Sequence, residues 1–184
     1  MPSLNNVNWV DLLIVLLLGR VVYIGIKKGF AVEAFKCIGV LSAAFFTLHY
    51  YSAFSKALEG RIPVPPANVD IVSYVFLWAF VIFAFKLIRN GVEVLFKMQA
   101  HPMLDMWGGL VLSVGRGFLL CSMTVLLLRL SGIGDFKKTT EASLSGSRLV
   151  VVAPKIYESI YNGFISKFFP SESLNTAAII SKEK

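Results

Sequence analysis

Five charged side chains lie within or beside apolar stretches of the sequence, and they are its first candidates for chemistry. They are Asp11, Arg20, Glu33, Asp105 and Arg116. An ionisable group inside a bilayer costs a few kcal/mol unless it is paired or hydrated. The two arginines lie several residues inside apolar runs and therefore need acidic partners, for which Glu33 and Asp105 are the obvious candidates.

The spacing of these charges predicts that they meet inside a helix bundle. Asp105 and Arg116 are eleven residues apart, close to three helical turns, so they share one helix face. We predict a network of charges between helices, which either fixes the helix register or lines a polar path for an ion or solute. For Asp11 alone, a position at a helix edge is favoured, because an acid suits the positive end of the helix dipole.

Small residues form a second pattern, at Gly25 and Gly29 and again at Gly109, Ser113 and Gly117. Each neighbouring pair within the two groups is four residues apart, as on one face of a helix. Small-xxx-small faces let helices approach closely in lipid. We therefore predict that these faces meet another helix, either within the chain or in a homo-oligomer.

The elements that carry these residues are predicted to be membrane-spanning helices. Of the 184 residues, 56% are hydrophobic and only 16% are charged, and the mean hydropathy is +0.70. Four mostly apolar stretches, at about residues 9–26, 31–51, 71–88 and 109–130, are close to the length of about 20 residues that crosses a bilayer core. The predicted fold is all-α, an integral membrane bundle of four transmembrane helices with a C-terminal amphipathic helix.

We divide the chain into a four-span transmembrane domain at 1–131, a polar linker at 132–149, an amphipathic interfacial helix at 150–170 and a flexible tail at 171–184. In the amphipathic segment, Tyr157, Tyr161, Phe164 and Phe168 recur at i, i+4, i+7 and i+11. Pro154 suits a first helical turn. The helix is too short to span, so we expect it on the headgroups, with packing against a partner protein as the alternative.

The net charge of +7 comes from Lys and Arg residues that lie mostly beside hydrophobic runs. That placement indicates contact with lipid headgroups and excludes nucleic acid as the expected partner. Basic residues flank the spans at both predicted faces in nearly equal number, so the positive-inside rule does not decide the orientation.

Motifs for catalysis are absent from the sequence. It contains no P-loop, no G-x-G-x-x-G after a strand, no H-E-x-x-H and no G-x-S-x-G. His49 and His101 are far apart, and the two cysteines, Cys37 and Cys121, lie in apolar runs without a ligand pattern. We expect no cofactor, no metal site and no enzymatic activity.

Four short motifs, in this order, resemble the CvpA family, which is named for its link to colicin V production in bacteria. They are "WVDLLIVLLLGR" with Asp11, "GIKKGFAVEAF" with Lys28, Gly29, Phe30 and Glu33, "LDMWGGLVLSVGRGFLL" with Asp105, Gly109, Arg116 and Gly117, and "SGSRLVVVAP" with Ser147 and Pro154. The resemblance covers residues 8–154. Met106 and Ser113 depart from it, since the family commonly has a basic residue and a glycine at these places.

The resemblance implies a multi-pass protein of the bacterial inner membrane, associated with toxin production or export and with the cell envelope. The expected function is therefore a non-enzymatic accessory role in producing or secreting a colicin V-type bacteriocin. Expected partners are the lipid bilayer and either further copies of the chain or other envelope proteins. The alternative is a small transporter or channel whose path is lined by Arg20, Glu33, Asp105 and Arg116.

Overall fold

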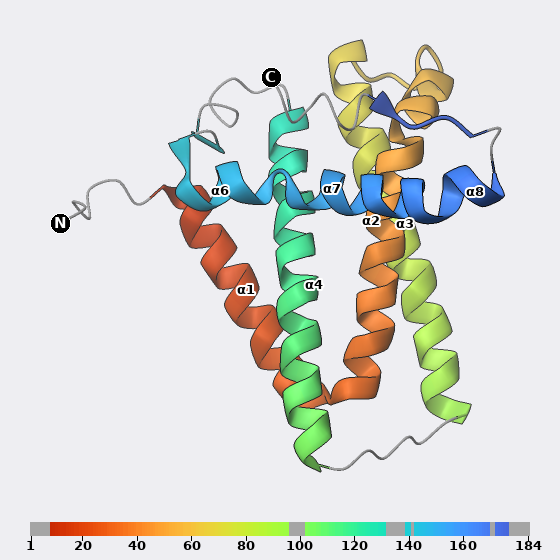
Figure 1. Cartoon of the computed structure of the whole chain (residues 1–184). Helices are drawn as coiled ribbons and strands as arrows, with labels where there is room; N and C mark the ends of the chain where they lie inside the picture. Colours follow the sequence, from red (N-terminus) through yellow and green to blue (C-terminus); the bar gives the residue numbers. More distant parts are fainter. Residues whose placement is uncertain (1–7, 96–101, 132–138, 141, 170–171, 177–184) are drawn as a thin grey trace.

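Four long helices form the bundle in the computed structural model, which describes residues 8–95, 102–131, 139–140, 142–169 and 172–176 (Figure 1). The helices are α1 (Trp9–Lys28), α2 (Phe30–Leu58), α3 (Pro66–Leu95) and α4 (Pro102–Leu130). All four are long and apolar enough to cross a membrane. The predicted all-α bundle of four transmembrane helices is confirmed, and the described residues include no strand.

The order of packing differs from the order of the chain. α2 packs against both α3 and α4, whereas α1 packs mainly against α4. In the spanning part of α4, 50% of the residues are buried inside the bundle, and in that of α2 the share is 39%. In α1 and in α3 the buried share is only 17%. α2 and α4 therefore form the centre of the bundle, and α1 and α3 lie at its edges, exposed to lipid.

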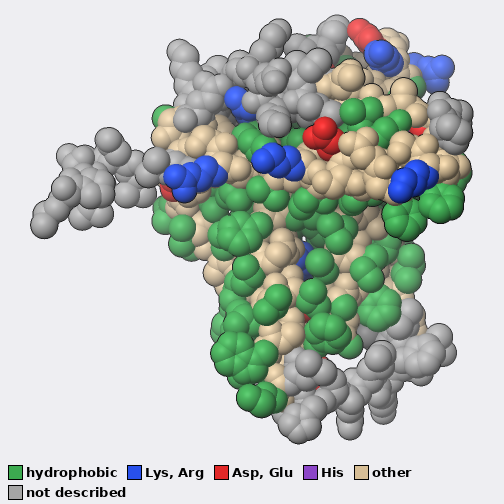
Figure 2. All heavy atoms as spheres, viewed as in Figure 1, with side chains coloured by type: hydrophobic (Ala, Val, Ile, Leu, Met, Phe, Trp, Pro, Cys, Tyr) green, Lys and Arg blue, Asp and Glu red, His purple; other side chains and the backbone are tan. Residues whose placement is uncertain are grey.

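The C-terminal segment crosses the bundle as a row of short helices (Figure 1). It consists of α6 (Leu144–Leu149), α7 (Val152–Ile160), a π-helical turn (Tyr161–Ile165) and α8 (Ser166–Phe168). Figure 2 shows Lys and Arg side chains at the level of this row and mainly hydrophobic side chains on the spanning helices below it. This distribution is the one expected of helices at a membrane interface.

Two parts of the C-terminal segment differ from the prediction. α6 lies inside the stretch predicted as linker, because the Ser143 hydroxyl accepts a hydrogen bond from the Gly146 N–H at 2.8 Å and starts a helix there. The aromatic stripe is also split by the π-helical turn, which changes the helical register. Tyr157 is buried against the bundle, whereas Phe164 and Phe168 are exposed.

The small residues bring α1 and α4 into close contact. A Cβ atom on Gly25 would overlap the Ser113 side chain, and one on Gly109 would lie 2.7 Å from the Gly25 carbonyl oxygen. A Cβ atom on Gly117 would lie 2.9 Å from Leu18 Cδ2. In lipid, such close approach replaces the hydrophobic effect as the source of helix association. The small-residue face of α4 therefore meets a helix within the same chain.

We expect Gly25→Ala to lower the free energy of unfolding by about 1–3 kcal/mol, because the added methyl group forces α1 away from Ser113. Gly19→Ala is the matched control on the same helix, since a Cβ atom there meets nothing within 4 Å. Unfolding of the purified protein in mixed micelles measures both. Equal effects of the two substitutions would contradict the close α1–α4 contact.

Candidate functional site

A buried carboxylate, Glu33, lies at the centre of the charged residues of the bundle. Its side chain is 0% exposed, and Oε2 lies 2.8 Å from Nη2 of Arg116, which α4 supplies. Lys36, one turn further along α2, places Nζ 2.5 Å from Oε1. Glu33 thus joins the two central helices and is shared between two cations.

The ionic contacts of this cluster leave some of its polar atoms without hydrogen bonds. Although Glu33 Oε2 and Arg116 Nη2 are in ionic contact, Oε2 has no hydrogen-bond partner of good geometry within the described part of the chain. Arg116 Nε is also buried without a partner there. Removing two charges from water is compensated fully only when their remaining polar atoms are bonded too. The Arg116 Nε–H group therefore lacks a hydrogen-bond acceptor among the described residues.

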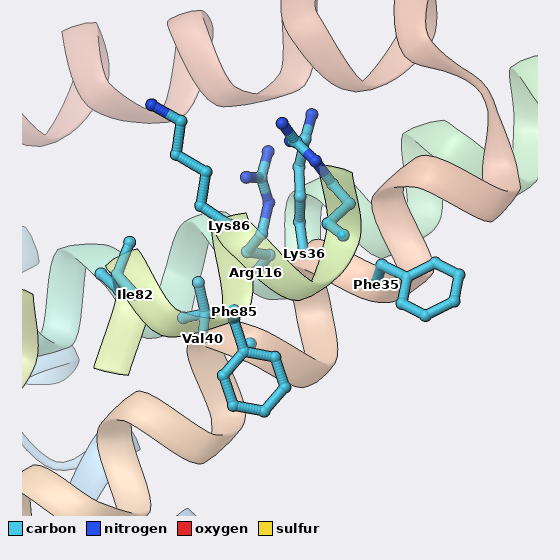
Figure 3. Close-up of a pocket in the computed structure, with 9 residues that line it drawn as sticks. Phe35, Lys36, Val40, Ile82, Phe85, Lys86 and Arg116 are labelled. Carbon is cyan, nitrogen blue, oxygen red and sulfur yellow. The ribbon is translucent and has the colours of Figure 1, made fainter. Parts of the chain in front are cut away.

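A cavity of about 230 Å³ lies beside this cluster, between α2, α3 and α4. Its lining includes the cations Lys36, Lys86, Arg89 and Arg116. In Figure 3 the labelled side chains of Lys36, Lys86 and Arg116 extend to the same side of the helices, away from Phe35 and Phe85. A cavity of this kind, with several donors and net positive charge, can accept an anion.

Asp105 has a different role from the one that its spacing suggested. Its Oδ1 accepts a hydrogen bond from the Phe30 N–H at 3.1 Å, so it caps the start of α2 from the first turn of α4. Gly29 joins α1 to α2 with φ of 81°, and a Cβ atom there would lie 3.2 Å from the Asp105 carboxyl group. Glycine is therefore required at this junction both for its backbone conformation and for space.

Asp11 connects the start of α1 to the C-terminal segment. Its Oδ1 accepts hydrogen bonds from the Ser143 hydroxyl at 2.7 Å and from the Ser145 N–H at 3.0 Å. The side chain of Asn8, which caps α1, also donates to the Thr139 carbonyl. Asp11 does lie at a helix edge, and there it binds the first turn of α6.

The structure does not join the five predicted charges into one network. Glu33 and Arg116 meet, whereas Asp105 and Asp11 bond elsewhere. Arg20 is exposed and makes no ion pair with another described side chain, because it lies outside the stripe of α1 that faces α4. The expectation that Arg20 has an acidic partner is wrong for the described residues. Of the four charges proposed for a transport path, the described residues bring only Glu33 and Arg116 into contact, and the path itself stays a prediction.

Sequence reasoning missed a second polar cluster, which attaches the C-terminal segment to α2. His49 Nδ1 lies 2.9 Å from the Tyr157 hydroxyl, and His49 Nε2 lies 3.2 Å from Glu172. The side-chain amide of Asn175 donates to the Leu48 carbonyl at 2.7 Å. Glu172 and Asn175 lie in the stretch predicted as a flexible tail, and both contact the bundle. His101 lies outside the described residues.

A metal site has no support in the described ranges, where no three His, Cys, Asp or Glu side chains gather closely enough to hold an ion. The expectation of no cofactor stays a prediction.

Comparison with known proteins adds one finding. The family model described as "Colicin V production protein" matches residues 10–154. No curated protein and no solved structure matches the chain. The matched range contains the four spanning helices except for Trp9, the first residue of α1, together with the Glu33–Arg116 pair and the contact of Asp11 with α6.

We expect Asp105→Ala to lower the free energy of unfolding by about 1 kcal/mol, because the Phe30 N–H loses its acceptor. Asp105→Asn keeps an oxygen atom at the same place and should cost less. Unfolding of the two variants in the same micelles compares them directly. An Asn variant as unstable as the Ala variant would contradict the capping role.

Burial raises the pKa of Tyr157, which lies in α7 outside the spanning helices; the Asn175 N–H opposes this effect, and Tyr161, Tyr50 and Glu172 add to it. Contacts made by this hydroxyl therefore stabilise the fold below the ordinary tyrosine pKa of about 10. They are lost as the pH rises through the higher folded-state pKa.

The difference in tyrosinate absorbance between the wild type and Tyr157→Phe isolates this group. We expect the difference to titrate above the ordinary tyrosine pKa, and protection of the C-terminal segment from protease to fall over the same pH range. A difference that titrates at the ordinary pKa would show that the hydroxyl is not buried against α2.

Proposed function

The chain belongs to the Colicin V production protein family, and from this membership we propose that it is a non-enzymatic component of the bacterial inner membrane, required to produce or secrete a bacteriocin-type toxin. The observation that carries the proposal is the extent of the family match. It includes the four spanning helices, apart from Trp9, and the side chains that hold α2 to α4 and α1 to α6.

The way in which the bundle is built supports a role through contacts with other proteins. α2 and α4 are committed to internal packing, while α1 and α3 lie at the edges. α3 exposes Phe76, Phe80, Phe83 and Leu87 on its outer side. Lipid or the spanning helix of another envelope protein, or of a second copy, can cover such a face.

Complementation tests the proposal in a bacterium that secretes a bacteriocin and has lost its own member of this family. We expect the loss to lower toxin activity in the medium and expression of this chain to restore it. Toxin is assayed separately in the medium and in the cell lysate. A role in production lowers both amounts, whereas a role in secretion lowers the first and raises the second.

Two variants sharpen this experiment. Arg116→Gln removes the partner of Glu33 and should fail to restore toxin, while Arg20→Gln removes an exposed charge and should restore it. The amount of each variant in the membrane is measured alongside. Unchanged toxin in both fractions after loss of the family member would contradict the proposed function.

A further inference from the structure

The cavity between α2, α3 and α4 has more positive charge than its protein partners balance. Lys36 and Arg116 share the single carboxylate of Glu33. Lys86 also lines the cavity and makes no ion pair with another described side chain. Arg89 also lines the cavity and donates to the Asn90 side chain at 3.0 Å. Positive charge in low-dielectric surroundings strongly favours a bound anion.

Arg116 lines this cavity. Its side chain is only 10% exposed, and its Nε has no hydrogen-bond partner among the described residues. A buried donor without a partner destabilises the fold, and more so when it is charged. An anionic oxygen atom in the cavity would supply negative charge beside Arg116.

A shallow, open apolar groove on one face of α3 lies next to the cationic cavity. It has a volume of about 460 Å³ and is lined by Val75, Trp78, Ala79, Ile82, Phe83 and Lys86. Ile82 and Lys86 line both hollows, so the cavity and the groove are adjacent. Together they offer a charged end and an apolar end to one amphiphilic molecule.

The size and depth of the cavity fit a lipid headgroup. At roughly 30 Å³ per water, its volume holds seven or eight waters, less than the roughly 300–1,000 Å³ of a drug-sized site. Lys36 lies six residues beyond Phe30, about 9 Å along α2 from the α1–α2 junction. Val75 precedes Lys86 by eleven residues in α3, so from Lys86 the groove runs away from the C-terminal end of this helix and towards its middle.

We propose that this cavity and groove bind one membrane lipid with an anionic phosphate headgroup. The phosphate lies among Lys36, Lys86 and Arg116, and an acyl chain lies in the groove beside Trp78. Basic pockets between transmembrane helices are suited to such headgroups. This proposal does not depend on the proposed role in toxin production. It concerns only which lipid of the surrounding bilayer the bundle binds.

Fluorescence of Trp78 provides the test, because this side chain lines the groove itself. The full chain with Trp9→Phe and Trp107→Phe is placed in phosphatidylcholine nanodiscs. A small fraction of the lipid carries brominated acyl chains, which quench tryptophan on contact. We expect brominated phosphatidylglycerol to quench Trp78 more strongly than brominated phosphatidylcholine does.

Substitutions separate the headgroup site from general attraction to the surface. Lys36→Gln and Lys86→Gln should each reduce the preference for phosphatidylglycerol about fivefold, which corresponds to ~1 kcal/mol per cation. Lys155→Gln is the matched control, since it removes one exposed charge from α7 and should leave the preference unchanged. Ala79→Phe fills the groove and should lower quenching by both lipids alike.

A second arm distinguishes the lipid from a free anion. Inorganic phosphate is added to nanodiscs of phosphatidylcholine alone, against chloride of equal ionic strength. Equal quenching by the two brominated lipids overturns the proposal, and a saturable phosphate response that Lys36→Gln abolishes would then assign the cavity to a free anion. A preference that Lys155→Gln reduces as much as Lys86→Gln does would overturn it too.

Discussion

The bundle depends on one buried carboxylate, that of Glu33, and on the arginine that it holds. Glu33 lies one turn into α2, and Arg116 lies in the middle of α4, so their contact fixes the two central helices against each other. Breaking a buried pair by removing one partner leaves an uncompensated charge, which is far costlier than losing a surface pair. The register of α2 against α4 is therefore strongly constrained.

The rest of the structure positions this pair. Gly29 and Asp105 start α2 so that Glu33 falls inside the bundle. The small residues of α4 hold α1 on its other side, and Asp11 connects α1 to α6. The cations that Glu33 does not satisfy surround the cavity. The interaction that holds the bundle together thus also creates the site that we assign to a lipid.

The four spanning helices could be predicted from the sequence, because the length of an apolar run is a local property of the chain. The sequence also identified Glu33 and Arg116, since charges inside apolar runs are costly. It could not separate Arg20 from Arg116, because both lie in apolar runs and only the rotation of each helix in the bundle decides which one finds a partner. The contact of His49 with Tyr157 joins residues 108 apart without a motif, so nothing local could reveal it.

A double-mutant cycle on Glu33 and Arg116 tests the central claim most directly. The free energy of unfolding is measured in mixed micelles for Glu33→Gln, Arg116→Gln and the double variant. We predict that each single change costs about 3–5 kcal/mol. The double variant should cost less than their sum by at least about 1 kcal/mol. Effects that add to within about 0.5 kcal/mol would show that the two residues do not depend on each other, and would contradict the account.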